Sequence, residues 1–325
     1  MSRFATELPT VTTARAHHYV PQCYLIGFAR EGKITVVDVK TGKGPFATNP
    51  KNVAQERDFN RIDGADLPAD ALENAYGAFE GELAPVLKGL IAGERCGEEQ
   101  FEYVLSLVGV LALRNPRYRA SFSGFQNSVR HQMLAVALSS KERWEKQLAR
   151  MRADGYLQGK PDVPYETLKE HLAKGDIRFV TTTSEHARAE LHSLEVITEV
   201  LTRRRWRWVR ANKDSGGFIT CDHPVCLNWI KRPRGFAPLG YGLTGTTVYS
   251  PLSPDLAILG EFGGPTDDVW ADAYMAGDFN RRVLNNTERQ AFVSDGFKVF
   301  DGVNLFGIDE LMRRARAVQN TSQGP

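Results

Sequence analysis

The sequence contains no hydrophobic run long enough to cross a membrane. No stretch approaches the roughly 18 consecutive apolar residues that suggest a spanning helix, and residues 1–16 lack the apolar core of a secretory signal. Only four cysteines occur among 325 residues, at irregular spacings, which excludes a disulfide framework. These absences predict a cytoplasmic protein with free thiols and no membrane partner.

The chain also lacks a large net charge and two common catalytic motifs. Its 41 basic and 39 acidic side chains leave a formal charge of +2, which neither favours nor excludes nucleic acid, because a basic face can exist within a balanced total. The sequence has no Walker phosphate-binding loop and no Gly-x-Ser-x-Gly nucleophile turn, so P-loop NTPases and α/β-hydrolases have no support.

The order of periodic segments predicts an α+β fold. Residues 33–39 are rich in β-branched side chains and predict a strand. Apolar residues then recur at helical spacing over about residues 67–204, and strands alternate with turns after them. We therefore predict one domain over residues 17–317, in which N- and C-terminal strands form a mixed sheet around a long helical insert. Residues 1–16 are predicted to be mobile and residues 318–325 to form a polar tail.

Short blocks of distinctive sequence occur in order over roughly residues 17–295. They read His17-His18-Tyr19-Val20-Pro21-Gln22-Cys23-Tyr24-Leu25, then Pro50-Lys51-Asn52-Val53-Ala54, Arg114-Asn115-Pro116, Phe218-Ile219-Thr220-Cys221-Asp222-His223-Pro224-Val225 and Tyr249-Ser250-Pro251-Leu252-Ser253-Pro254. Together they resemble an uncharacterised bacterial family, domain of unknown function 4238. That family has no agreed activity, so the resemblance implies membership and no chemistry. In the family pattern Ser and Asn flank the aspartate, whereas Cys221 and His223 flank Asp222 here.

The pair His17-His18, shortly followed by Pro21, resembles the first element of His-Asn-His (ββα-metal) nucleases. In such a site one histidine binds a divalent cation and the other deprotonates the water that attacks phosphorus. A metal neutralises the charge that develops on phosphate, and imidazole titrates near neutral pH. The downstream histidine of that motif is missing, since no further histidine occurs before His131. The alternative is that both histidines hydrogen-bond within the fold or bind a ligand without catalysis.

Asp222 follows a predicted strand and precedes Pro224, where a carboxylate can point into a cleft. It can bind a metal or orient a histidine, or it can accept hydrogen bonds from neighbouring backbone N–H groups as a turn residue. A zinc site made by Cys221, His223 and Cys226 is a weaker alternative, because the Cys-x₄-Cys spacing has no strong zinc precedent.

Arg114 ends a helix, over about residues 98–114, that is apolar almost all round. A charge at such a position either clamps a phosphate or carboxylate of a substrate with a bidentate contact or forms a structural ion pair. The candidate carboxylates for an ion pair are Glu56, Glu73 and Glu80.

Two basic clusters favour nucleic acid as a partner. Residues 203–210 mix Arg with Trp, as nucleic-acid surfaces do, although the same alternation describes a strand with Trp packed inward and Arg in solvent. Residues 231–235 lie in a predicted loop and are better placed to touch phosphates.

These features lead to a hypothesis of a metal-dependent phosphodiesterase or nuclease, of the kind used by toxins or in phage defence. In it, His18 is the general base, His17 and Asp222 bind Mg²⁺ or Mn²⁺, Gln22 orients the water or the phosphate, and Arg114 stabilises the charged transition state. The two β regions must then meet in space. The rival hypothesis is a non-enzymatic ligand- or nucleic-acid-binding protein that recognises a nucleotide, a peptide or a partner through the same cleft. A third option is a different hydrolase that uses His and Asp on a non-phosphate substrate.

Overall fold

The structure of the chain is a computed structural model that describes residues 15–62, 67–157, 163–235 and 237–322. Its helices are α1 (Gln22–Ile26), α2 (Ala71–Ile91), α3 (Glu98–Leu113), α4 (Pro116–Ala137), α5 (Lys141–Ala153), α6 (Tyr165–Lys174), α7 (Thr183–Thr202), α8 (Ala273–Asn286) and α9 (Ile308–Ser322). The strands are β1 (Ala16–His18), β2 (Ile34–Asp38), β3 (Lys43–Thr48), β4 (Gln55–Arg57), β5 (Arg205–Ala211), β6 (Thr220–Cys221), β7 (Cys226–Trp229), β8 (Thr246–Pro251), β9 (Leu256–Glu261), β10 (Val269–Ala271), β11 (Gln290–Val293), β12 (Val299–Phe300) and β13 (Leu305–Phe306). The predicted α+β class is confirmed. Residues 1–14 of the segment predicted to be mobile lie outside the described residues.

The sheets differ from the single mixed sheet that the sequence predicts. N- and C-terminal strands do share a sheet, in the order β3-β2-β11-β6, but all of its pairings are antiparallel. The mixed sheet, in the order β10-β5-β9-β8-β7, is made of C-terminal strands alone, and its parallel pair is β10 with β5. Short strand pairs β1-β4 and β12-β13 complete the pattern. Strand patterns reveal which face of a strand is buried but not its partner, which explains the error.

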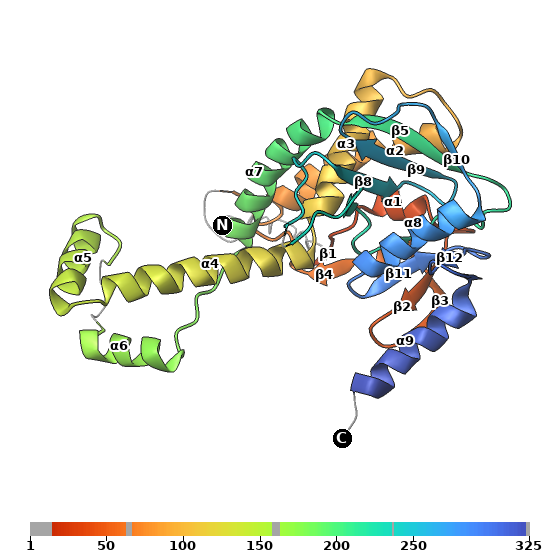
Figure 1. The fold of residues 1–325 in the computed structure, drawn as a ribbon. Helices are drawn as coiled ribbons and strands as arrows, with labels where there is room; N and C mark the ends of the chain where they lie inside the picture. The colour runs from red at the N-terminus through yellow and green to blue at the C-terminus, as the bar shows by residue number, and fades with distance from the viewer. Residues whose placement is uncertain (1–14, 63–66, 158–162, 236, 323–325) are drawn as a thin grey trace, which may run out of the picture.

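The larger core lies between the five-stranded sheet and helices α2, α3 and α7 (Figure 1). Helix α3 is buried along most of its length, as its apolar sequence predicts, and Trp206 and Trp208 of β5 pack toward it. The helix ends at Asn115-Pro116, as predicted: the Asn115 side chain accepts a hydrogen bond from the Tyr118 N–H and caps α4, and Pro116 occupies its first turn.

A second core joins the two large sheets through α8. Phe279 and Val283 of this helix pack in one cluster with residues of both sheets, among them Tyr249 of β8 and Ala291 of β11. Asn280, on the same helix, is fully buried, and its amide bonds the backbone at Gly217, Ile219 and Lys298. This core fixes the ends of β6 and β11 relative to each other.

Helices α4, α5 and α6 extend away from this body as an arm (Figure 1). Helix α4 ends at Ala137 and α5 begins at Lys141, because the chain turns at Ser139 and the Ser140 side chain caps α5. No helix within the described ranges is both long and apolar enough to cross a membrane.

Candidate functional site

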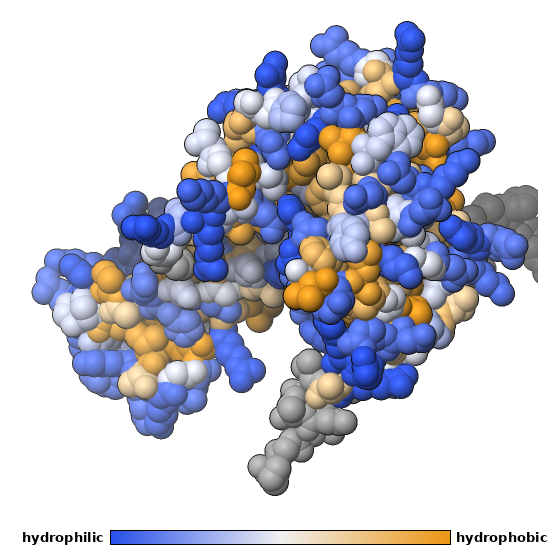
Figure 2. Space-filling view, turned by 45° about the vertical axis from the view of Figure 1, so that its right-hand side comes forward, coloured by the Kyte–Doolittle hydropathy of each residue, from blue (hydrophilic) through white to orange (hydrophobic). Residues whose placement is uncertain are grey.

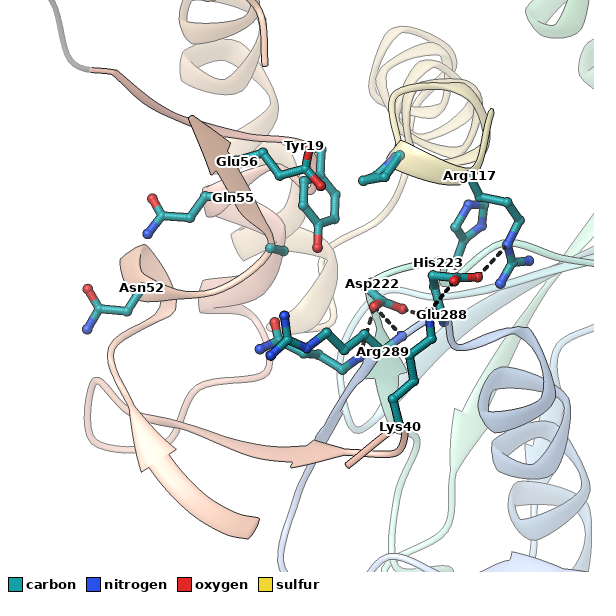
Figure 3. A pocket seen from close by; sticks show the side chains of 13 residues that line it. Tyr19, Lys40, Asn52, Gln55, Glu56, Arg117, Asp222, His223, Glu288 and Arg289 are labelled. Atoms are coloured by element: carbon teal, nitrogen blue, oxygen red, sulfur yellow. Dashed lines mark hydrogen bonds and ion pairs between the residues drawn. The ribbon is translucent and has the colours of Figure 1, made fainter. Parts of the chain in front are cut away.

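A polar pocket of ≈ 370 Å³ lies where the β1-β4 pair, the start of α4 and the ends of β6 and β11 meet (Figure 3). Tyr19 comes directly after β1, and Arg117 belongs to the first turn of α4. The opposite wall is made of Asp222 and His223, which follow β6, and of Glu288 to Gln290, which lead into β11. N-terminal, helical and C-terminal parts of the chain therefore all contribute.

Asp222 is the structural anchor of this pocket. Its Oδ1 accepts a hydrogen bond from the backbone N–H of Glu288 at 2.8 Å, and its Oδ2 accepts from those of Arg289 at 2.7 Å and Gln290 at 2.8 Å. Burial raises the pKa of the carboxyl, and these three hydrogen bonds oppose the rise. These N–H groups lie 66 to 68 positions away along the chain, so Asp222 joins two distant segments and is not the turn aspartate of the sequence alternative. By fixing the 288–290 backbone, Asp222 directs two charged side chains into the pocket.

Three cations surround the pocket, and a carboxylate lies between two of them. Glu288 accepts hydrogen bonds from Lys40 Nζ at 2.6 Å and Arg117 Nε at 3.3 Å. The Lys40 contact is the main reason that the pKa of Glu288 is below its usual range, so this side chain is anionic at neutral pH. Arg117 also donates to the side chain and carbonyl of Asn286. Arg289 Nε donates to Asp38 Oδ2 at 2.9 Å.

Two neutral groups add hydrogen-bonding capacity. Burial, and then the nearby charge of Asp222, raises the pKa of Tyr19 far above neutrality, so its hydroxyl is a permanent donor. Figure 3 shows this hydroxyl directed into the pocket toward Asp222 and Arg289. Burial, and then the Arg117 cation, lowers the pKa of His223 to about 4. Its Nε2 is buried and finds no hydrogen-bond partner among the described residues.

The histidines of the predicted catalytic site lie in a different place, beside α2. His17 is 4% exposed, and its Nδ1 accepts a hydrogen bond from the Asn60 N–H at 2.8 Å. Burial lowers the pKa of His18, while the carboxylates of Glu80 and Glu73 oppose that shift. Neither histidine lines the pocket that contains Asp222.

Arg114 and Gln22 also belong to that second cluster. Arg114 is 2% exposed; its guanidinium donates to the Tyr19 carbonyl and to Glu80 and stacks 4.0 Å from the centre of the Tyr76 ring. The Gln22 backbone N–H donates to Glu80 at 2.9 Å. Glu80 is thus the partner among the three candidate carboxylates, and the contacts are those of a structural ion pair.

His17 and Asp222, the residues predicted to bind a metal, do not line the same pocket. Asp222 lines the pocket without His17 or His18, and both of its oxygens already bond backbone N–H groups. Within the described part of the chain, no three His, Cys, Asp or Glu side chains are grouped closely enough to hold an ion. Cys221 and Cys226 are buried free thiols, and this observation adds no support for the zinc alternative.

Arginines of the basic run after α7 form hydrogen bonds and ion pairs within the fold. Arg204 is 4% exposed and donates to the backbone carbonyls of Thr246 and Tyr241, while Arg207 and Arg210 pair with carboxylates. This is the strand interpretation, with Trp packed inward. Residues 231–235 form an exposed loop, as predicted, outside the pocket.

Sequence reasoning missed Lys40, Arg117, Tyr19 and Arg289 as pocket residues. No local motif marks the three cations among 41 basic side chains; only Tyr19, within the histidine block, had a signal. Residues 240–245, Gly-Tyr-Gly-Leu-Thr-Gly, have the Gly-x-Gly-x-x-Gly spacing of dinucleotide-binding loops. They lead into strand β8 and not into a helix, so they lack the context of a dinucleotide site.

The fold and the pocket define an α+β protein with a polar cleft between its elements, lined by three cations and by the carboxylates of Glu56, Asp222 and Glu288. The family model described as a protein of unknown function (DUF4238) matches residues 16–297, which is most of the chain, and the chain belongs to this family. Neither a curated protein nor a solved structure matches it.

Proposed function

We propose that the protein binds the phosphate groups of a nucleotide in the pocket between Tyr19, Arg117 and Arg289. The observation that carries this proposal is the convergence of Lys40, Arg117 and Arg289 with the Tyr19 hydroxyl on one cavity of ≈ 370 Å³. Guanidinium groups bind phosphate oxygens with paired, charge-assisted hydrogen bonds. A cavity of this size is at the lower end of the range for small-molecule sites.

The internal anion Glu288 favours a ligand with more than one negative charge. It already neutralises part of the charge of Lys40 and Arg117. A monocarboxylate that displaced it would exchange one anion for another, with little gain in electrostatic energy. A terminal phosphate or a diphosphate carries about two or more charges near neutral pH and gains on exchange. We therefore expect nucleoside di- and triphosphates to bind more tightly than single phosphodiesters.

Phosphodiester cleavage is the second candidate, because proton-transfer groups lie beside these cations. Asp222 and His223 can accept a proton, Tyr19 can donate one, and Arg117 can stabilise charge on a transition state. The roles predicted for His18, Gln22 and Arg114, and the dependence on Mg²⁺ or Mn²⁺, stay predictions that belong to this candidate.

Binding is tested by isothermal titration calorimetry with ADP, ATP, inorganic phosphate and a short single-stranded RNA. Arg289→Ala is expected to weaken ATP binding by about tenfold or more, because a hydrogen bond to a charged group contributes about 1.5–3 kcal/mol. Arg232→Ala removes an exposed cation outside the pocket and is the matched control. Absence of nucleotide binding, or equal affinities for the two variants, would contradict the proposal, with thermal unfolding used to verify folding.

Cleavage is tested on RNA, DNA and a generic phosphodiester, with Mg²⁺ or Mn²⁺ against a chelator. Activity that needs the metal and disappears in His18→Ala supports the metal-dependent nuclease. Activity that survives chelation and is lost in His223→Asn assigns the chemistry to the pocket. Nucleotide binding without turnover in any condition supports the non-enzymatic rival.

A further inference from the structure

The arm formed by α4, α5 and α6 has almost no core of its own. These helices contain 22, 13 and 10 residues, yet α5 and α6 bury none of them and α4 buries only Arg119, next to the body. Ordering a helix costs conformational entropy at every residue, and packing of an apolar face normally offsets this cost. The arm therefore keeps its apolar face in solvent, in contrast to α3.

That face forms an open groove of ≈ 800 Å³ between α4, α5 and the segment before α7. Trp144, Met151 and Phe179 line it, with Met133 and Val136 of α4 on its wall. Met133 is 66% exposed and Val136 is 58% exposed, although both are large apolar side chains. Figure 2 shows hydrophobic residues gathered on this face of the arm. A contiguous exposed patch of this kind is typical of a binding surface.

The charges around the groove indicate the chemistry of its partner. Arg130 and Arg143 line it, and none of its described lining residues is acidic. Of the α4 arginines only Arg130 lies at the groove, because Arg117 and Arg119 pair with carboxylates of the body. Helix α5 carries five basic residues against two glutamates. Arg130 already pairs with Glu185, but Arg143 forms no ion pair with a described residue. Two copies of this arm would therefore repel each other, whereas an acidic partner would be attracted.

We propose that this groove binds an amphipathic helix of a partner protein, one with an apolar stripe flanked by Asp and Glu. An apolar stripe at positions i, i+3, i+4 and i+7 matches a groove lined by Met, Trp and Phe, because a helix lays such a stripe into a hydrophobic cleft. Flexible methionines adapt to different apolar anchors. The acidic flanks meet the arginines of the rim. This interaction is independent of the phosphate pocket.

The probe is a fluorescein-labelled designed peptide of about 18 residues, or about 27 Å of helix. It carries Leu at the stripe positions and Glu on both flanks; a second peptide carries Lys in place of Glu. Fluorescence anisotropy with the full chain is expected to give saturable binding of the Glu peptide, and binding of the Lys peptide about tenfold weaker or more. Met133→Glu places a carboxylate in the apolar groove and is expected to bind the Glu peptide about tenfold more weakly than the unchanged chain does. A factor of ten corresponds to about 1.4 kcal/mol.

Val303→Glu is the matched control, because Val303 is 80% exposed and lies between β12 and β13, away from the arm. It should leave the affinity unchanged. Equal binding of both peptides, no binding of either, or an equal loss in Val303→Glu would overturn the proposal. So would light scattering that reports a dimer which Met133→Glu converts to a monomer, since a second copy would then be the occupant.

Discussion

Asp222 and His223 are adjacent in the sequence but have opposite electrostatic environments. Asp222 is ringed by backbone N–H donors, which compensate much of the cost of burying a carboxylate. His223 has no such compensation: its ring is buried beside the Arg117 cation, and its Nε2 lacks a partner. The first residue is therefore an anchor of the pocket. The second is a neutral imidazole that is costly to protonate.

This difference predicts a pH dependence of stability. The pKa of His223 is about 4 in the fold against 6.5 for the ordinary side chain. Between these values the unfolded chain binds more protons, so the free energy of unfolding falls as pH drops through this window. The expected loss is about 3 kcal/mol for this group. Urea unfolding of wild type and His223→Asn from pH 7 to pH 4 measures it. Parallel curves for the two proteins would show that His223 is not responsible.

At the scale of the elements, the loop between β5 and β6 packs closely against the loop after β11. Gly216, between β5 and β6, has φ +80°, and a Cβ built there would lie 2.2 Å from the Gly296 carbonyl oxygen, after β11. The loop that precedes Asp222 and the loop that follows β11 therefore approach too closely for a side chain at Gly216. Gly32 has a similar φ of +73°, but a Cβ there meets no atom within 4 Å.

The two glycines form a matched pair of substitutions. Gly32→Ala is expected to cost about 1–2 kcal/mol of unfolding free energy, from the left-handed backbone alone. Gly216→Ala adds a clash with the backbone, which is expected to lower the free energy of unfolding by about 1–3 kcal/mol more. Chemical denaturation of both variants measures the difference. An equal loss of unfolding free energy in the two variants would mean that the loops at Gly216 and Gly296 move apart easily. The close approach at Gly216 would then not stabilise the pocket.

At the scale of the whole molecule, stability is distributed unevenly between body and arm. Strand β8 is buried at every residue, and β9 at all but Glu261. Helices α5 and α6 have no buried residue. Local opening requires less free energy where little apolar surface is buried.

Hydrogen exchange is therefore expected to divide the chain into two classes. Amides of α5 and α6 should exchange orders of magnitude faster than those of β8 and β9, which need global unfolding. Mass spectrometry after timed deuteration measures this, and the distal half of α4 should follow α5. Uniformly slow exchange across the arm would indicate that it is already covered, for example by another protein copy.

The amino-acid sequence by itself determined the class of fold, the core helix α3, its end at Asn115-Pro116 and the family. These features depend on local periodicity, capping and short motifs, which are written along the chain. The functional site was harder to predict from the sequence than the fold class. His17, His18 and Arg114 were recognised as unusual, but the structure places them in a buried cluster with Glu80 and Asn60.

Only the tertiary structure decided which polar residues meet. Lys40, Arg117 and Glu288 are separated by up to about 250 positions, and no local pattern records that an N-terminal turn, a helix start and a C-terminal loop face one cavity. The mixed sheet was misassigned for the same reason, since strand partners are set by packing across the core. The exposed groove of the arm likewise depends on α5 folding back on α4. Local chemistry fixes elements, whereas long-range packing fixes sites.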